Sequence, residues 1–183
     1  MDLSSYSVRD FDRGAPRWKE ALWLIVKNLL FMSSWPWPSA LKVAILRGFG
    51  AKVGNGVVIR TRVNITFPWR LAIGNHVWIG DEVFILSLAP VSIGSNVCIS
   101  QRAFLCSGSH DFRQPGFDLI TRPITIGDQC WVASQAFVAA GVELGERTVV
   151  GAGSVVLKSV PAGVFVGGNP ARILQTMDER RPE

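Results

Sequence analysis

The sequence contains two histidines, and one of them, His110, stands where a regular pattern is interrupted. It ends the stretch "LCSGSH" and precedes the polar, proline-bearing segment "DFRQPGFDLITRP". A neutral imidazole, whose ordinary pKa is about 6.5, can take a proton from a hydroxyl group at cellular pH. His110 is therefore the candidate general base. We expect His76, in the fragment "IGNHVW", to be an outward turn residue without a role.

The elements that must position His110 follow a repeat of six residues. An aliphatic residue recurs at every sixth position, often followed by glycine, as in "IGNHVW", "IGDEVF" and "IGSNVC". The fifteen aliphatic positions fall into sets of three: Val53, Ile59, Ile65; Ile73, Ile79, Ile85; Ile93, Ile99, Leu105; Ile126, Val132, Val138; Leu144, Val150, Val156. Extra residues occur only between sets, which indicates that every insertion leaves the structure at the same corner.

A period of six fits neither a helix nor a long alternating strand, but it fits short strands joined by tight corners. We expect each hexad to give an inward aliphatic residue and a glycine or polar residue at a turn with unusual backbone angles. Three hexads form one triangular coil, and stacked coils pair their strands in parallel. The sequence thus predicts an all-β parallel helix of five coils over 53–161, with His110 ending the third coil and 111–125 as a projecting loop.

The flanking segments are less regular. Residues 1–52 are predicted to form an N-terminal helical segment, and two interpretations stay open for 16–49: a cap on the coil, or a helix lying on a membrane surface. The apolar run "ALWLIVKNLLFM" is too short to span a bilayer, which needs about 20 residues. Residues 162–183 form a C-terminal extension, whose end, "QTMDERRPE", is expected to be mobile.

Composition limits the number of domains, the classes of partner and the location that we expect. With 183 residues and a net charge of +5, we expect one main domain with a mildly basic surface suited to anionic ligands. The basic residues are scattered, which argues against nucleic acid as a partner. The three cysteines, Cys98, Cys106 and Cys130, have no zinc-site spacing and favour a reducing, cytoplasmic location, as does the absence of a signal peptide pattern.

Residues 53–174 resemble the hexapeptide-repeat acyltransferases. The stretches "ISQRAFLCSGSHDF" and "GAGSVVLKSVPAGVFVGGNPARIL" are most similar to the branch of colanic acid biosynthesis acetyltransferases, which is related to galactoside and maltose O-acetyltransferases. The resemblance implies a left-handed β-helix, a homotrimer with active sites between subunits, and transfer of an acetyl group from acetyl-CoA to a saccharide hydroxyl. The context it implies is exopolysaccharide or cell-surface polysaccharide biosynthesis.

The resemblance also implies roles for individual residues. His110 matches the catalytic base, and backbone N–H groups around Ala133 and Ser134 are expected to stabilise the oxyanion. The residues that match coenzyme A contacts are Ser134, Ala152, Lys158 and Arg172. Leu157 stands where the galactoside enzymes have threonine, so one polar contact to the coenzyme is expected to be missing.

On the acceptor side, Gly80 replaces an asparagine that binds acceptor in the galactoside enzymes. The neighbouring Asp81 and Glu82 are candidates to bind sugar hydroxyls or to orient the imidazole, or they are ordinary corner residues. Trp131 matches a residue that lines the active-site groove in the galactoside enzymes, or it is an outward aromatic residue that covers a contact between subunits. We expect Trp78 to cover such a contact. We expect the acceptor to be a saccharide: a lipid-linked one if the N-terminal segment lies at the inner face of the membrane, and equally well a soluble one if that segment caps the coil.

Other functions stay open. An N-acetyltransferase acting on an amino-sugar nucleotide would use the same base, and a non-catalytic β-helix binding module would use none. A β-helix carbonic anhydrase is excluded because it needs three histidines for zinc, and no metal site is expected. Cys106 is a poor candidate for a covalent nucleophile, since only two histidines are present to serve it as base.

Overall fold

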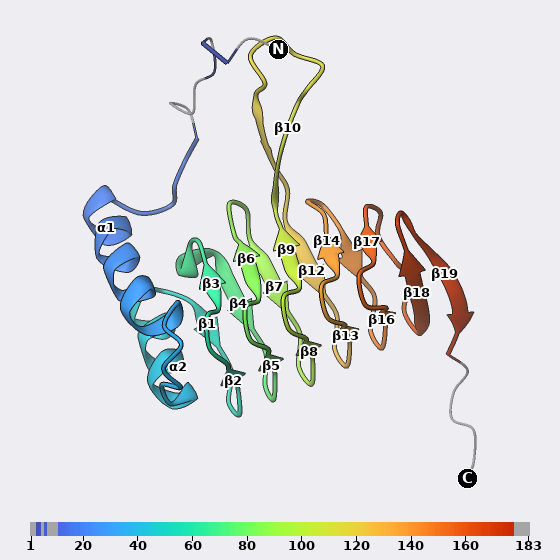
Figure 1. The fold of residues 1–183 in the computed structure, drawn as a ribbon, viewed down its shortest axis with the longest axis horizontal. Helices are drawn as coiled ribbons and strands as arrows, with labels where there is room; N and C mark the ends of the chain where they lie inside the picture. Colours follow the sequence, from blue (N-terminus) through green and yellow to red (C-terminus); the bar gives the residue numbers. More distant parts are fainter. Residues whose placement is uncertain (1–2, 5, 7–10, 178–183) are drawn as a thin grey trace.

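The repeat of six builds three flat walls around one aliphatic core. The computed structural model describes residues 3–4, 6 and 11–177. The aliphatic residues of corresponding hexads lie one above another inside the coil, where Ile59, Ile79 and Ile99 are at most 2% exposed. Their strands pair in parallel and in register from coil to coil, for example Val58 with Trp78 and Ile59 with Ile79. Figure 1 shows the successive coils stacked along the long axis of the molecule.

We number the walls in chain order. Wall 1 contains β1 (Lys52–Val53), β4 (Leu71–Ile73), β7 (Val91–Ile93), β12 (Ile124–Ile126) and β15 (Glu143–Leu144). Wall 2 contains β2 (Val58–Ile59), β5 (Trp78–Ile79), β8 (Cys98–Ile99), β13 (Trp131–Val132), β16 (Val149–Val150), β18 (Val164–Gly168) and β19 (Ala171–Thr176). Wall 3 contains β3 (Asn64–Ile65), β6 (Phe84–Leu86), β9 (Phe104–Cys106), β14 (Phe137–Val138) and β17 (Val155–Val156). A short 3-10 turn, η2 (Pro68–Arg70), joins β3 to β4.

The five predicted coils are present, and part of a sixth follows them. Val160 forms a β-bridge with Leu144, and β18 pairs in parallel with β16. Val160, Val164 and Val166 are buried. Val160 follows Val156 by four residues and not six, which is why the repeat did not predict this turn. β19 then returns antiparallel to β18, so Gln175 and Thr176 belong to a strand rather than to a mobile tail. Residues 178–183, the rest of that predicted tail, lie outside the described residues.

The glycines that directly follow the inward aliphatic residues serve close packing between coils, whereas the turns with positive φ carry polar residues or, at Gly56 and Gly153, glycine, as the sequence predicted. A Cβ atom on Gly94 would lie 2.8 Å from the backbone nitrogen of Asp128, and one on Gly145 would lie 2.3 Å from that of Ala162. The polar residues at these turns have φ of 55–61° and are Arg62, His76, Glu82, Asn96, Arg102, Gln129, Gln135 and Arg147. His76 is therefore a turn residue, as expected.

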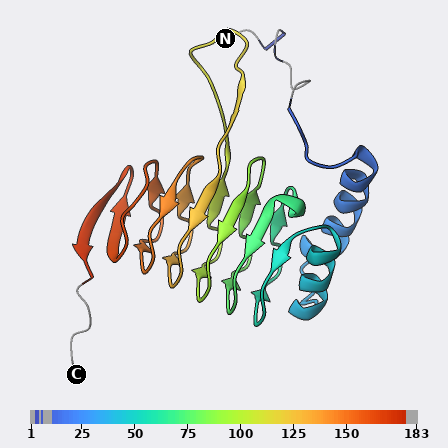
Figure 2. The same ribbon diagram turned by 180° about the vertical axis from the view of Figure 1, so that it is seen from behind.

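Helices close the N-terminal end of the coil (Figure 2). They are α1 (Arg17–Val26), the π-helical segment η1 (Lys27–Phe31) and α2 (Ser39–Gly48). Their side chains cover carbonyl groups of the first coil: Trp23 donates to Ile65 O (2.9 Å), and Lys42 to Arg60 O (2.6 Å). Sheet edges otherwise expose unpaired backbone groups, so this segment is a cap. No helix among the described residues is long and apolar enough to cross a membrane.

A single hairpin, which we call the arm, projects from the corner between walls 3 and 1 (Figure 1). It is formed by β10 (Gly108–His110) and β11 (Leu119–Thr121), which pair antiparallel, with His110 opposite Leu119. The insertion therefore leaves the coil before His110. The sequence placed His110 at the end of the third coil, whereas the structure places it in the stem of the arm, because pairing begins directly after β9.

Candidate active site

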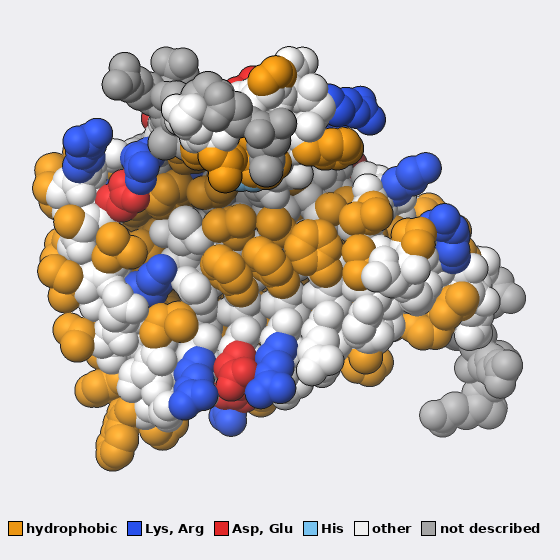
Figure 3. All heavy atoms as spheres, turned by 45° about the horizontal axis from the view of Figure 1, so that its top comes forward, with side chains coloured by type: hydrophobic (Ala, Val, Ile, Leu, Met, Phe, Trp, Pro, Cys, Tyr) orange, Lys and Arg blue, Asp and Glu red, His pale blue; other side chains and the backbone are white. Residues whose placement is uncertain are grey.

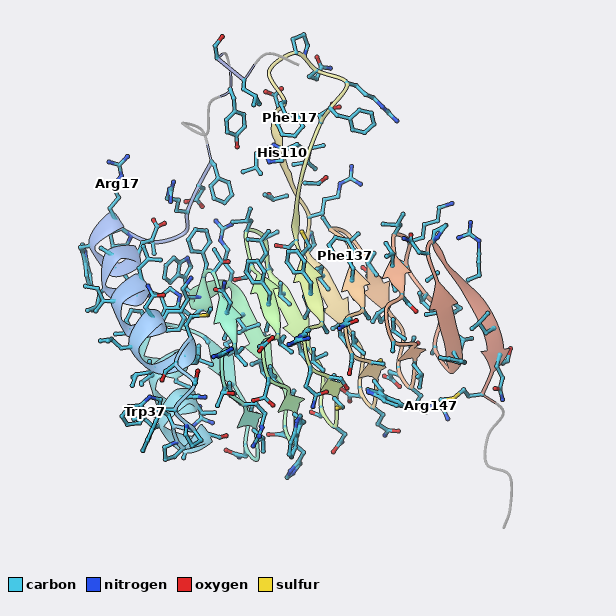
Figure 4. All side chains as sticks on the ribbon, viewed as in Figure 1. Arg17, Trp37, His110, Phe117, Phe137 and Arg147 are labelled. Carbon is cyan, nitrogen blue, oxygen red and sulfur yellow. The ribbon has the colours of Figure 1, made fainter. Side chains whose placement is uncertain are left out.

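The imidazole of His110 is fixed by Phe117, seven residues further along the arm. Its Nδ1 lies 2.8 Å from the backbone carbonyl oxygen of Phe117. A carbonyl can only accept, so Nδ1 carries the hydrogen and Nε2 of the neutral ring keeps a free lone pair. The ring also stacks on the Phe117 ring, with centroids 4.2 Å apart and planes 3° from parallel (Figure 4). Phe117 thus sets the tautomer of the ring and leaves Nε2 able to accept a proton.

The loop at the end of the arm brings these two residues together. Asp111 N donates to Asp118 O (2.8 Å), and Phe117 N donates to Gln114 O (3.1 Å). Phe117 has a φ of 51°, which is uncommon for a residue with a side chain and occurs where the surroundings hold it. The local turn thus places both the ring and the carbonyl of Phe117 against His110.

His110 lines a cavity of 340 Å³ between the arm and the N-terminal segment. Tyr6 approaches its ring edge to face, with centroids 5.5 Å apart. Glu20 and Lys27 from the helical cap supply polar groups on the other side, and Thr66 supplies a hydroxyl. Burial lowers the pKa of Lys27, whose Nζ donates to Asn64 Oδ1 (3.1 Å). A mixture of aromatic and polar groups in a space of this size suits a small polar ligand.

A second group of predicted site residues lies at the corner between walls 2 and 3. Asp81, Glu82 and Ser134 line one cavity of 280 Å³, which does not include His110. Asp81 accepts hydrogen bonds from Thr61 N (3.1 Å) and Thr61 Oγ1 (2.6 Å), and the Thr61 hydroxyl holds the pKa of Asp81 below its ordinary value.

Arginines engage both carboxylates. Arg60 pairs with Asp81 at 3.3 Å, and Arg102 pairs with Glu82 at 2.7 Å. The bond from Arg102 also lowers the pKa of Glu82. Neither carboxylate contacts the imidazole of the same chain, whose Nδ1 is bound by the carbonyl of Phe117. The roles of Asp81 and Glu82 stay predictions.

Two of the four predicted coenzyme residues lie together. Lys158 and Arg172 line a cavity of 650 Å³ at the C-terminal end of the coil. Ser134 and Ala152 occupy neighbouring coils at the corner between walls 2 and 3, where Gly153 N donates to Ser134 O (2.9 Å). Of the two backbone N–H groups predicted to stabilise the oxyanion, that of Ala133 already donates to Val150 O (2.9 Å). The N–H group of Ser134 stays a candidate.

Known proteins share this sequence and fold. A curated Escherichia coli protein, the putative colanic acid biosynthesis acetyltransferase WcaF, is 44% identical over 178 residues, which is 96% of both chains. The chain belongs to the hexapeptide-repeat acetyltransferases. Residues 123–158 match the family model described as "Bacterial transferase hexapeptide (six repeats)". The E. coli galactoside O-acetyltransferase is 28% identical over 84% of this chain and 78% of its own.

Solved structures of the family superpose over most of the chain. The hexapeptide-repeat acetyltransferase VCA0836 of Vibrio cholerae, complexed with acetyl coenzyme A, gives a TM-score of 0.80 at 28% identity and covers 89% of each chain. A galactoside acetyltransferase in complex with coenzyme A gives 0.80 at 26% identity, covering 92% of this chain and 85% of its own. The fold is the left-handed parallel β-helix of this family, and the chain is an acyltransferase.

Cys106, which precedes His110 by four residues, lies in an environment that does not favour a nucleophilic thiolate. Burial raises the pKa of the Cys106 thiol, and its Sγ lies 3.1 Å from Gly108 O, to which it donates. A thiol in this state is a weak nucleophile at neutral pH. Cys106 is therefore a poor candidate for a covalent nucleophile.

Other predicted residues lie apart from His110. Trp131 is 48% exposed on wall 2, and its Nε1 donates to Ser100 Oγ (2.9 Å), so both interpretations of it stay predictions. Figure 4 shows Phe137 on wall 3, below the arm that carries His110. Among the described residues, no group of three or more His, Cys, Asp or Glu could hold a metal ion.

Sequence reasoning missed the residues that surround His110. Phe117, Tyr6 and Glu20 come from the arm tip and the N-terminal segment, neither of which follows the hexad pattern. The insertion contains two aromatic residues, Phe112 and Phe117, and nothing in the sequence distinguished the one that contacts His110. Arg113 and Asp118 are exposed in the loop of the arm.

Proposed function

We propose that the chain transfers an acetyl group from acetyl-CoA to a hydroxyl of a saccharide, with His110 as the general base. The orientation of the imidazole supports this function most: Phe117 O fixes the hydrogen on Nδ1 and leaves Nε2 to accept a proton. We place the reaction in cell-surface polysaccharide biosynthesis in the cytoplasm, by analogy with the E. coli relative named for colanic acid biosynthesis.

The proton path needs only this one residue. Nε2 of His110 takes the hydroxyl proton as the acceptor oxygen attacks the thioester carbonyl carbon. The bond between that carbon and sulfur then breaks, and the imidazolium returns the proton to the leaving thiolate. The products are a saccharide ester and coenzyme A. Phe117 O stabilises the imidazolium through the Nδ1 hydrogen in the intermediate stage.

The residues proposed to hold acetyl-CoA fit its charge. Lys158 and Arg172 in the 650 Å³ cavity supply cations for the phosphates, and Arg can do so with a planar fork. Ala152 and Ser134 form the corner along which the pantetheine arm would run. Leu157 is 55% exposed where the galactoside enzymes have threonine, which supports one missing polar contact.

We propose that the functional unit is a homotrimer in which a neighbour completes each site. Within one chain, His110 is on the arm, whereas Asp81, Glu82 and Ser134 share a different corner. A groove between two copies would bring the arm of one chain to that corner of the next, and Trp131 would line it. The 340 Å³ cavity beside His110 is the proposed place of the acceptor saccharide.

A panel of saccharides incubated with acetyl-CoA tests the function. We expect one or more products heavier by one acetyl group, and their loss in hydroxylamine, which cleaves esters but not simple amides. A hydroxylamine-resistant product on an amino sugar would show N-acetylation and overturn the proposed acceptor chemistry. Absence of saturable coenzyme A binding would make the chain a binding module and overturn the proposal altogether.

A further inference from the structure

The helical cap carries an apolar surface that points away from the coil. We call it the outer face, and its members are Trp18, Leu22, Ile25, Leu29, Trp35 and Leu41, which are 41–68% exposed. The first four are spaced by four, three and four residues, so they share one side of α1 and its continuation into η1. In Figure 3, hydrophobic side chains gather along this helical end of the molecule, at the left.

Capping the coil does not require the outer face. Trp23 and Phe31, which are fully buried, fill the opposite side of the same helix and pack edge to face with centroids 5.1 Å apart. Leu46 and Val43 do the same for α2. Large exposed apolar groups concentrated on one end of a protein mark a surface that contacts something else.

The charges around this end indicate what it contacts. Residues 11–80, which contain the cap and the first coil, include ten Lys and Arg but only two carboxylates, Asp12 and Glu20. Arg60 and Arg62 pair with Asp81 and Glu82 of the next coil. The excess of cations over carboxylates makes this end positive. Arg17, Arg47 and Lys52 are exposed at the cap and the first coil.

We propose that the outer face binds the surface of a lipid bilayer that contains anionic headgroups. Tryptophan side chains favour the boundary between headgroups and acyl chains, and Trp18 and Trp35 are 68% and 67% exposed here. Apolar side chains at this depth, together with nearby cations, bind anionic lipid without spanning it. A protein partner with a purely hydrophobic surface gives no reason for the excess of cations at this end.

If the function proposed above holds, the membrane contact would place the candidate active site near lipid-linked substrates. Glu20, Leu24 and Lys27 belong to the helical segment that bears the outer face, and they line the cavity beside His110. A bound membrane would therefore hold the cavity close to its surface, where a saccharide linked to a lipid is presented.

Flotation of the full chain with vesicles tests the proposal. We expect the parent to float with vesicles of phosphatidylethanolamine and phosphatidylglycerol, to bind pure phosphatidylcholine at least about tenfold more weakly, and to be released as salt rises. The double variant Ile25→Ser/Leu29→Ser should lose at least about tenfold in vesicle affinity. Leu174→Ser/Met177→Ser, which changes two exposed apolar residues at the other end of the coil, should bind like the parent.

Two further measurements decide between outcomes. Acetyl transfer to a soluble acceptor should be equal in the parent and in Ile25→Ser/Leu29→Ser, which shows that this variant folds. Absence of flotation by the parent, or equal flotation by both double variants, would overturn the membrane contact while leaving the proposed function intact. Light scattering would also overturn it if Ile25→Ser/Leu29→Ser, and not the control variant, had half the molecular mass of the parent in solution. The outer face would then join copies of the chain.

Discussion

At the scale of residues, one backbone carbonyl determines what the imidazole can do. Phe117 offers its carbonyl to Nδ1 and its ring to the face of His110, so it fixes both the tautomer and the tilt of the base. Acid and base catalysis depends on this geometry, because a proton moves only along a short and aligned hydrogen bond. Phe117 is therefore a positioning residue.

The ring of Phe117 can be removed while its carbonyl stays. We expect Phe117→Ala to lower kcat by about tenfold, because the imidazole loses the face that holds it, with the KM for acetyl-CoA unchanged. Phe112→Ala is the matched control, since Phe112 lies in the same arm and is 74% exposed. Steady-state kinetics would contradict the assigned role if Phe112→Ala were as slow as Phe117→Ala, or if only KM changed.

At the scale of elements, the spacing between coils decides which residues the repeat can carry. Parallel strands lie about 4.8 Å apart, and at the corner between walls 1 and 2 the backbone of each coil meets that of the next. Gly94 has no room for a side chain there. The cap has a different task. It covers the exposed strand edges of the first coil with packed aromatic rings.

The crowded corner predicts a loss of stability. Gly94→Ala should lower the free energy of unfolding by about 1–3 kcal/mol, because its Cβ would meet the Asp128 backbone. Gly48→Ala, in α2 with nothing within 4 Å of the new atom, should be neutral or stabilising by up to about 1 kcal/mol. Denaturant unfolding measures both, and equal effects would show that close approach is not the reason for the glycine.

The two sides of α1 predict opposite outcomes for the same substitution. Trp23→Ala should destabilise the chain by about 3–5 kcal/mol, because it leaves a cavity beside Phe31 and removes the donor to Ile65 O. Trp18→Ala, at a residue that is 68% exposed, should change stability by less than about 0.5 kcal/mol. Thermal unfolding in the absence of lipid tests this, and a large loss in Trp18→Ala would mean that the outer face supports the fold.

The aliphatic period was enough to predict the three walls, the core and the corner that bears the arm, because it depends on burial alone. It could not predict Phe117, since that contact depends on the pairing register of β10 and β11. It also missed the sixth coil, where Val160 follows Val156 by four residues. The period also predicted turns with unusual backbone angles at polar residues, of which His76 is one.

At the scale of the whole molecule, one chain holds the parts of the proposed site at separate places. His110 is on the arm, Asp81 and Ser134 are at the corner of walls 2 and 3, and Lys158 lies at the C-terminal end. A rigid coil cannot bend to bring these together. In the proposed trimer, copies that assemble side by side would bring these parts together.

Mixed assemblies test this directly. His110→Asn and Lys158→Glu/Arg172→Glu should each be nearly inactive alone. Co-expressed in equal amounts, they should recover about one quarter of the parent activity, because most closed trimers then contain one intact site between two copies. Activity no higher than the sum of the separate variants would place the whole site within one chain.

The most direct test of the account compares the two histidines. Asn at position 110 can still donate to Phe117 O but offers no ring nitrogen as base, and Asn also tolerates the left-handed turn at position 76. We expect His110→Asn to lower turnover of acetyl-CoA with a saccharide acceptor by about 10²-fold or more, with coenzyme A affinity unchanged, and His76→Asn to keep the parent rate. Turnover by His110→Asn within about threefold of the parent would contradict a general base at His110.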